Sequence, residues 1–275
     1  MNSSQKSELK VLAAKARLGA IIGTFNAKSG HPGGSLSIAE MLSYLYFYKL
    51  NVDPKNPKWD DRDRFVLSKG HTAPALYGAL ALKGFFPTTE IAKLRQADSF
   101  LQGHPDMKHT PGVDMSSGSL GLGISAAAGM ALSAKISGDA YRVYTIVGDG
   151  ESEEGQVWEA AMFSAHYKLD NLCAFIDWNG LQIDGKVTDV MNPTPLDEKF
   201  KAFGWNVIMI DAHDFEQIEA ACEAARACKG KPTAVICKSV KGKGVSFMEN
   251  QVGWHGKAPS KEQYETAIAE LSASV

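Results

Sequence analysis

Two polar turns in the sequence combine residue types that could hold a metal ion. Asp149 lies between Gly148 and Gly150 at the end of one apolar run, and Asn179 follows a second apolar run one strand–helix–strand unit later. Carboxylate and amide oxygens are hard ligands of the kind that Mg²⁺ takes, and Mg²⁺ keeps further positions for phosphate oxygens and water. The flanking glycines let backbone N–H groups approach an anion. Each turn alone is usually only a turn, but the pair at this spacing predicts a site for a metal and a diphosphate.

Four of the seven histidines stand beside glycine or proline, in the contexts "SGHPGG", "KGHTAP", "QGHPD" and "GWHGK". Such neighbours indicate rigid loops that present the ring, although a single loop histidine is more often solvated or structural. Imidazole can accept and donate a proton near neutral pH. The four are therefore candidates for proton transfer, and they are His31, His71, His104 and His255. We expect His166 and His213 to be structural, and His109 stays undecided.

These residues need a scaffold, and the pattern of apolar runs predicts an α/β fold. Runs rich in β-branched residues predict five strands, at 64–68, 141–147, 171–177, 206–211 and 233–238. Helical patterns occur before and between them, at 7–27, 37–49, 119–137, 155–168, 196–203 and 214–228. Alternating strands and helices form a parallel sheet with helices on both faces. Ligands of such sheets bind beyond the carboxyl ends of the strands, which is where both polar turns fall.

Local signals refine two of these helices. Asp214 is a good N-cap, Gln217 would complete a capping box, and Gly230 follows the end of the same helix. The uncharged run Ser116–Ala134 is rich in Ser, Gly and Ala and predicts a closely packed, buried helix. No change in composition marks a boundary, so we expect residues 1–275 to form a single domain.

Composition excludes several classes of protein. The 275 residues carry a formal net charge of −2, which gives no indication of binding to nucleic acid or an anionic membrane. Four cysteines show neither CxxC pairs nor metal-ligand spacing, and the polar start "MNSSQKSELK" has no apolar signal region. A cytoplasmic protein is the expectation.

Motifs along nearly the whole chain resemble those of transketolases. The metal turn reads "GDGESEEGQVWEA" and is followed by "IDWNGLQIDG". The other matching segments are "KSGHPGGSLSIAEML", "DRFVLSKGHTAPALYGAL", "GHPD", "SSGSLGLGISAAAGMALSAK" and "KSVKGKGVSFMENQVGWHG". The chain resembles the amino-terminal, diphosphate-binding domain of that family, and the pyrimidine-binding and carboxyl-terminal domains of full-length transketolases have no counterpart in it. "GSLGLG" departs from the usual "GPLGQG" but keeps the glycines.

The resemblance implies thiamine diphosphate and Mg²⁺ as cofactors and assigns residues to them. The metal ligands would be the side chains of Asp149 and Asn179 and the carbonyl of Leu181. The residues on the cofactor's side would be His71, Gly118, Leu120, Gly150, Asn179, Lys241 and His255. The histidines that line the substrate channel would be His31, His104 and His255.

The function implied is transfer of a two-carbon ketol unit from a ketose phosphate to an aldose phosphate. Pentose and heptulose phosphates of the pentose phosphate pathway are the default substrates, and an apulose-type or sulfonated sugar is an alternative. A deoxyxylulose phosphate synthase-like or oxo-acid dehydrogenase-like component would share the metal turn but is not expected to carry all four histidine motifs. Because the remaining domains have no counterpart in the chain, we expect a split transketolase with a separate carboxyl-terminal subunit in an α2β2 heterotetramer, and a piece of a longer transketolase chain is the alternative.

Overall fold

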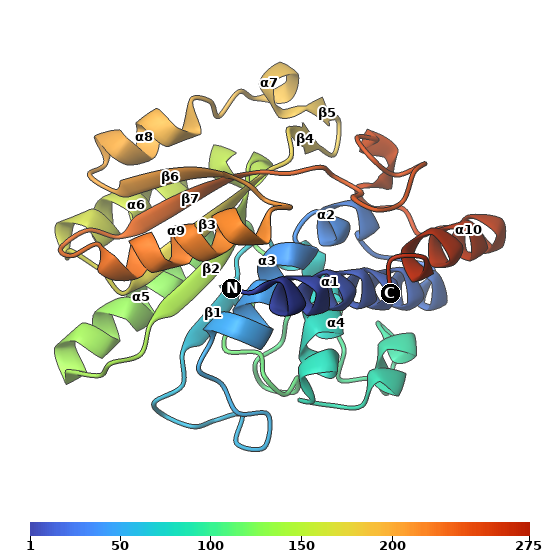
Figure 1. Ribbon diagram of the computed structural model, residues 1–275. Helices are drawn as coiled ribbons and strands as arrows, with labels where there is room; N and C mark the ends of the chain where they lie inside the picture. Colours follow the sequence, from blue (N-terminus) through green and yellow to red (C-terminus); the bar gives the residue numbers. More distant parts are fainter.

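The apolar runs form a five-stranded, fully parallel sheet in the computed structural model, which describes residues 1–275 (Figure 1). The order across the sheet is β1-β2-β3-β7-β6, and two short antiparallel strands make a separate ribbon. The strands of the sheet are β1 (Arg64–Leu67), β2 (Val143–Gly148), β3 (Leu172–Trp178), β6 (Asn206–Asp211) and β7 (Thr233–Lys238), and the ribbon consists of β4 (Leu181–Gln182) and β5 (Gly185–Lys186). The predicted α/β class and its five strands are confirmed.

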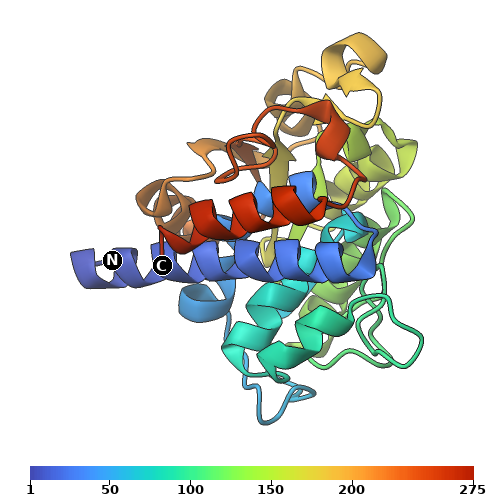
Figure 2. The ribbon, with the colours of Figure 1, turned by 90° about the vertical axis from the view of Figure 1, so that its right-hand side faces the viewer.

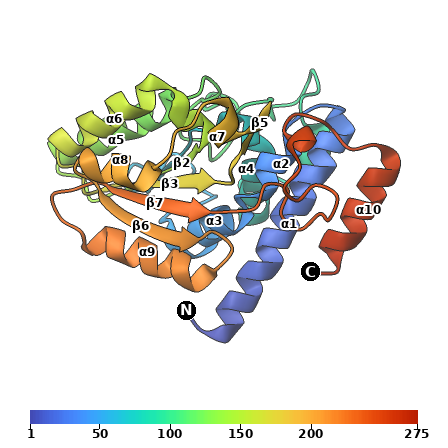
Figure 3. The same cartoon turned by 90° about the horizontal axis from the view of Figure 1, so that it is seen from above.

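Helices cover both faces of the sheet, as the view from above shows (Figure 3). The helices on one face are α1 (Ser3–Ala27), α3 (Ala39–Tyr44), α4 (Ala73–Lys83) and α9 (Phe215–Ala227). Those on the other face are α5 (Leu122–Ser137), α6 (Gly155–His166) and α8 (Leu196–Ala202). The remaining helices are α2 (Pro32–Leu36), α7 (Val187–Val190) and α10 (Lys261–Ser272). None of these helices is both long and apolar enough to cross a membrane.

Each strand contributes to both cores because its side chains alternate between the two faces. In β1, Phe65 and Leu67 lie in the core with α1 and α4, whereas Val66 lies in the core with α5. The central strands β2 and β3 are buried along almost their whole length. The close packing around these strands fixes the positions of their ends, and it therefore also restricts the positions of the residues that follow them.

The segment before α5 departs from the prediction. The helix expected from residue 119 begins at Leu122, because Gly118 and Gly121 both have positive φ and residues 116–121 form a loop. The expected full burial is also wrong, since α5 is buried on one face only. Apolar side chains stay exposed on α5, on α6 and just after α6; they are Leu122, Ile136, Met162, Phe163 and Tyr167.

Two other helices differ in detail. The pattern at 37–49 gives α3 followed by a π-helical turn over Leu45–Lys49. Asp214 caps α9 as predicted, with its side chain accepting from the N–H of Glu216. The capping box is not formed, because the Gln217 side chain donates to the Asp214 carboxylate and accepts from the N–H of Asp211.

The carboxyl-terminal helix α10 packs along α1, as the side view shows (Figure 2). Phe25 of α1 and Tyr264 of α10 stack with ring centroids 4.1 Å apart. Ile21, Ala267 and Leu271 belong to one apolar cluster under this contact. This pair of helices thus extends the structure beyond the edge of the sheet without adding a second sheet.

The four cysteines are all free thiols. Cys173, Cys222 and Cys237 are buried in the core between the sheet and α9, whereas Cys228 lies partly exposed after α9. Burial raises the pKa of Cys173 to about 12 and that of Cys222 and Cys237 well above the ordinary value. The three buried cysteines are therefore small core residues.

The close crossing of α1 and α4 yields a stability prediction. A Cβ added at Gly78 would lie 2.9 Å from the carbonyl oxygen of Ala16 and 3.2 Å from its Cα. Gly78→Ala should lower the free energy of unfolding by about 1–3 kcal/mol, because two backbones would have to separate. Gly129→Ala is the matched control, since a Cβ at this α5 position meets nothing within 4 Å. Urea denaturation checks the pair, and equal stability of both variants would contradict the packing argument.

Candidate functional site

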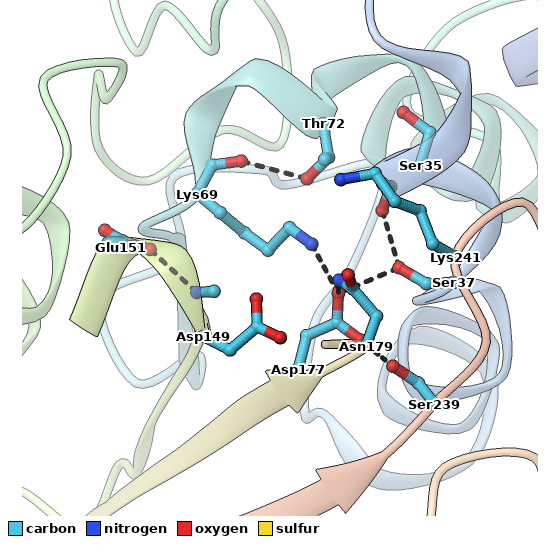
Figure 4. Close-up of polar contacts among 12 residues, drawn as sticks. Ser35, Ser37, Lys69, Thr72, Asp149, Glu151, Asp177, Asn179, Ser239 and Lys241 are labelled. Carbon is cyan, nitrogen blue, oxygen red and sulfur yellow. Dashed lines mark hydrogen bonds and ion pairs between the residues drawn. The ribbon is translucent and has the colours of Figure 1, made fainter. Parts of the chain in front are cut away.

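The two polar turns of the sequence meet at the carboxyl edge of the sheet. β2 and β3 are neighbours, and Gly148 is paired with Asp177 in their register. The N–H of Gly180 donates to the Asp149 carboxylate at 2.5 Å, and the N–H of Gly150 donates to the same carboxylate at 2.8 Å. The turn after β2 and the turn after β3 are thus joined directly, and Asp149 and Asn179 line the same cavity, with Asp177 drawn between them (Figure 4).

A cavity of about 250 Å³ opens above this edge. Ten of the residues singled out in the sequence line it, and they are His31, His71, Gly118, Leu120, Asp149, Gly150, Asn179, Leu181, Lys241 and His255. His104 is not part of this lining. It lies next to it, because a Cβ added at Gly118 would meet the His104 ring at 3.0 Å.

The oxygen donors of the cavity suit a hard cation. Asp149 offers a carboxylate, Asn179 an amide oxygen and Leu181 a backbone carbonyl, and all three residues line the cavity. The chain holds no group of three or more His, Cys, Asp or Glu side chains placed to bind a metal. A donor set with one carboxylate and two neutral oxygens fits Mg²⁺, which completes its shell with phosphate and water, better than zinc.

A buried ion pair forms the floor of the site. The ammonium of Lys69, just after β1, lies 2.5 Å from the carboxylate of Asp177, and both side chains are almost completely buried. Ser37 donates to this carboxylate at 2.8 Å, Ser239 also donates to it, and the amide of Asn179 donates at 3.0 Å (Figure 4). Because its Nδ2 is held by Asp177, the Asn179 amide has a fixed orientation.

The two buried aspartates have opposite electrostatic environments. Burial raises the pKa of Asp177, but the charge of Lys69 and hydrogen bonds from Lys69, Ser239 and Ser37 outweigh burial and hold this pKa below its ordinary value. Burial and the neighbouring charge of Asp177 raise the pKa of Asp149 to about 6. The donors to the Asp149 carboxylate are backbone N–H groups, so a metal ion bound there would be its direct cationic partner.

Lys241 brings a second ammonium to the cavity. It donates to the carbonyl of Leu181 at 2.8 Å and lies 2.9 Å from Nδ1 of His255. Burial, followed by the positive charge of Lys69, lowers the pKa of Lys241 to about 8. Two lysines from different strand ends thus face one cavity, and this arrangement suits a multiply charged anion.

The loop before α5 is tied to the end of β2 by a buried glutamate. The Glu151 carboxylate accepts from the hydroxyl of Ser68 at 2.5 Å and from the N–H groups of Gly121 and Gly148 at 2.9 Å each. Gly118 adopts φ 146°, which few side chains tolerate. This loop therefore approaches the cavity closely and presents Leu120, which is 36% exposed.

Three histidine rings cluster in the lining of the same cavity. The ring centroids of His31, His71 and His255 lie 5.1–5.5 Å apart in every pairing. Nδ1 of His31 is buried and has no hydrogen-bond partner in the protein. A buried polar atom without a partner is unusual, and this one lies in a residue that lines the cavity, where a ligand or a water molecule could satisfy it.

The pKa values of all four candidate histidines are lowered, which favours their neutral form. Burial, then the charges of Arg95, His104 and Lys241, lowers the pKa of His31 to about 4. Burial and Lys241 lower the pKa of His255 to about 3. The pKa values of His71 and His104 are also lowered, chiefly by burial. Neutral imidazoles can accept a proton at neutral pH.

Several residues of the site are not evident from the sequence. Lys69, Asp177 and Glu151 fall inside the motifs without an expected role, although a charged residue at the end of an apolar strand is a usable signal. The remaining histidines lie elsewhere. His166 is exposed at the end of α6, His109 contacts Asp106, and His213 joins the Glu40 carboxylate to the N–H of Val240.

Comparison with known families gives the same assignment as the motifs. The family described as "Transketolase, thiamine diphosphate binding domain" matches residues 9–271. The chain belongs to this transketolase family. The family predicted from the sequence motifs is thereby confirmed. Its members are transferases.

Relatives include separate subunits as well as long single chains. A 6-deoxy-6-sulfo-D-fructose transketolase subunit from Clostridium sp. (strain MSTE9) is 49% identical over 242 residues, covering 88% of each chain. One of the apulose-4-phosphate transketolase subunits, from Phocaeicola vulgatus, is 41% identical, covering 98% of this chain and 96% of that one. The crystal structure of transketolase from Campylobacter jejuni superposes with a TM-score of 0.92 at 33% identity, covering 99% of this chain and 43% of that one.

The metal turn gives a prediction on cofactor binding. Asp149→Asn keeps the size of the side chain but removes the negative charge, so Mg²⁺-dependent affinity for thiamine diphosphate in the assembled enzyme should fall by about 100-fold or more. Asp197→Asn, on α8, is the control because its carboxylate pairs with Lys201 away from the cavity. Calorimetric titration measures both. Unchanged affinity in the Asp149 variant would refute its role as a ligand.

The neutral histidines give a prediction on pH. His31 has an ordinary pKa of 6.5 when unfolded and about 4 in the folded chain, so the unfolded state binds more protons between these values. The free energy of unfolding should therefore fall as pH drops from 6.5 toward 4. In His31→Gln, the decrease in the free energy of unfolding over this pH range should be smaller than in the wild type by about 1 kcal/mol. This figure is discounted for the partial exposure of the ring.

Urea unfolding of the cofactor-free chain at about pH 7.5 and about pH 5 measures this effect. His166→Gln, at the exposed end of α6, should leave the pH dependence of the wild type in place. A His31 variant with the same pH dependence as the wild type would contradict the argument.

Proposed function

We propose that this chain is the diphosphate-binding subunit of a two-chain transketolase, in which residues 1–275 form one cofactor-binding domain. The observation that carries the proposal is the single cavity that joins Asp149, Asn179 and the Leu181 carbonyl to two lysines and a histidine cluster. Its cofactors are thiamine diphosphate and Mg²⁺. Four free cysteines fit a cytoplasmic setting.

The residues fit these cofactors in charge and in hydrogen-bonding capacity. Asp149, Asn179 and Leu181 would hold the metal ion, and Lys241 and the N–H of Gly150 would meet the diphosphate. Gly118, Leu120, His71 and His255 would lie along the rest of the cofactor. When bound, thiamine diphosphate supplies a nucleophilic carbon and an electron sink for the two-carbon unit.

The histidines supply the proton transfers that ketol transfer requires. In the ketose donor, the bond between C2 and C3 breaks. The hydroxyl on C3 must lose its proton in this step, so that C3 becomes the aldehyde carbon of the shortened aldose that departs. The acceptor's aldehyde oxygen must gain a proton as the new C–C bond forms. His31, His104 and His255 are proposed for these roles because all three are neutral bases beside the cavity.

A partner subunit is proposed from the exposed apolar surface and from the relatives. Leu122 is 52% exposed and Met162 57% exposed, on helices that flank the metal turn. Two relatives named as subunits match nearly the whole length of this chain. We infer a partner that contributes the pyrimidine-binding and carboxyl-terminal domains, in an α2β2 heterotetramer with closed symmetry.

The donor sugar has two candidates. Ketose phosphates of the pentose phosphate pathway are the default for the family. A 6-deoxy-6-sulfo sugar is the second candidate, because a relative named for that substrate is 49% identical. An apulose-type sugar is less favoured, since the relatives named for it are 41% and 39% identical.

Assembly provides the test of the proposal. The chain alone should bind Mg²⁺ and thiamine diphosphate weakly and show no ketol transfer, because the proposed partner would supply the residues that bind the cofactor's aminopyrimidine. Adding the carboxyl-terminal subunit should restore activity. Coupled assays with xylulose 5-phosphate, fructose 6-phosphate and 6-deoxy-6-sulfofructose then rank the donors. Full activity of the isolated chain would overturn the two-chain proposal.

A further inference from the structure

Arg95 stands out because its backbone adopts a conformation that is unfavourable for its residue type. Its φ is 61°, in the left-handed region that non-glycine residues seldom occupy. The conformation is maintained in part by the N–H of Arg95, which donates to the carbonyl of Leu101 at 2.8 Å. Strained backbone of this kind persists where the surroundings fix it, often at functional sites.

The guanidinium of Arg95 contacts two segments that are far apart in the sequence. Nη1 donates to the hydroxyl of Ser29 at 2.8 Å, two residues before His31. Nη2 donates to the carbonyl of Gly103 at 3.4 Å, directly before His104. One side chain therefore touches the neighbourhoods of two of the histidines proposed for proton transfer.

The fit between Arg95 and Gly103 leaves no spare room. A Cβ added at Gly103 would lie 2.7 Å from Nε of Arg95 and 2.8 Å from its Cζ. The loop that carries His104 is held from a second side by the hydroxyl of Tyr77, which lies 2.9 Å from the carbonyl oxygens of both Gln102 and His104 and shares its one proton between them. The loop thus has a defined position, and Arg95 connects that position to the segment of His31.

We propose that Arg95 is a positioning residue that ties the His31 segment to the His104 loop, so that both imidazoles face the same substrate. A planar guanidinium suits this role because its N–H groups point in fixed directions toward two acceptors. The catalytic consequence rests on the proposed transketolase function, whereas the structural link does not.

The charge of Arg95 has a second effect on the same rings. It is the charge that most lowers the pKa of His31, and it lowers the pKa of His104 after burial. His31 is also faced by His71, His104, Lys241 and His255. The charge of Arg95 acts on both His31 and His104, so the titrations of these two rings report whether the guanidinium lies beside both segments.

Histidine-selective NMR of the chain tests the proposal without any assay of activity. Signals are assigned with His31→Gln and His104→Gln variants. In Arg95→Gln, the titration midpoints of both rings should rise by about half a pH unit or more, because the nearby positive charge is lost. Arg142→Gln is the matched control, since Arg142 also donates to two backbone carbonyls but lies at the opposite end of the sheet.

Two further variants separate charge from geometry. Ser29→Ala should alter the His31 signal and leave that of His104 unchanged, because only one of the two contacts is removed. Arg95→Lys keeps the charge but not the planar fork, so the midpoints should stay near those of the wild type. In the reconstituted enzyme, Arg95→Lys should still lower kcat by about 10–100-fold with little change in the KM of the donor.

Two results would contradict the proposed role of Arg95. Unchanged midpoints in Arg95→Gln, or a change in only one ring, would refute the link between the two segments. A rise in KM with kcat unchanged would identify Arg95 as a substrate-binding group instead. If NMR shows the coupled shift and no ketol transfer is found with the partner, the link stands and the proposed function fails.

Discussion

The buried pair between Lys69 and Asp177 is the interaction on which the site depends. Two charges with almost no solvent contact are costly to bury unless they are paired and hydrogen-bonded, and the two serines and one amide around Asp177 meet that condition. The pair joins the end of β1 to the end of β3, and through Ser37 and Ser239 it also holds the segment after α2 and the end of β7. Replacing one partner alone would leave the other charge buried without compensation.

This pair also determines the electrostatics above it. Since Lys69 pairs with Asp177, the neighbouring Asp149 is the carboxylate of the site that is left to receive an external cation. The same ammonium, together with Lys241, acts against protonation of His71 and His255. One arrangement of charges therefore favours a cation at the metal turn, an anion near the lysines and neutral imidazoles in the same cavity.

The sequence predicts the sheet well because each strand is a continuous apolar run and each polar turn follows such a run. It also brings Asp149 and Asn179 together correctly, since neighbouring strand ends must meet. It fails where the decisive fact is a contact between distant segments. The pairing of Lys69 with Asp177, the glutamate that ties Gly121 to Gly148, and the clamp of Arg95 leave no periodic signal. The exposed face of α5 escapes prediction for a related reason, because composition gives apolarity but not which face is covered.

The distribution of the cysteines has a practical consequence. Three thiols are sealed under the sheet, while Cys228 alone reaches solvent, after α9 and before β7 begins. This position lies at the edge of the sheet opposite the cavity. A thiol-reactive fluorophore would thus label Cys228 alone, at a distance from the cavity. Energy-transfer measurements could therefore use the natural sequence, without an introduced cysteine.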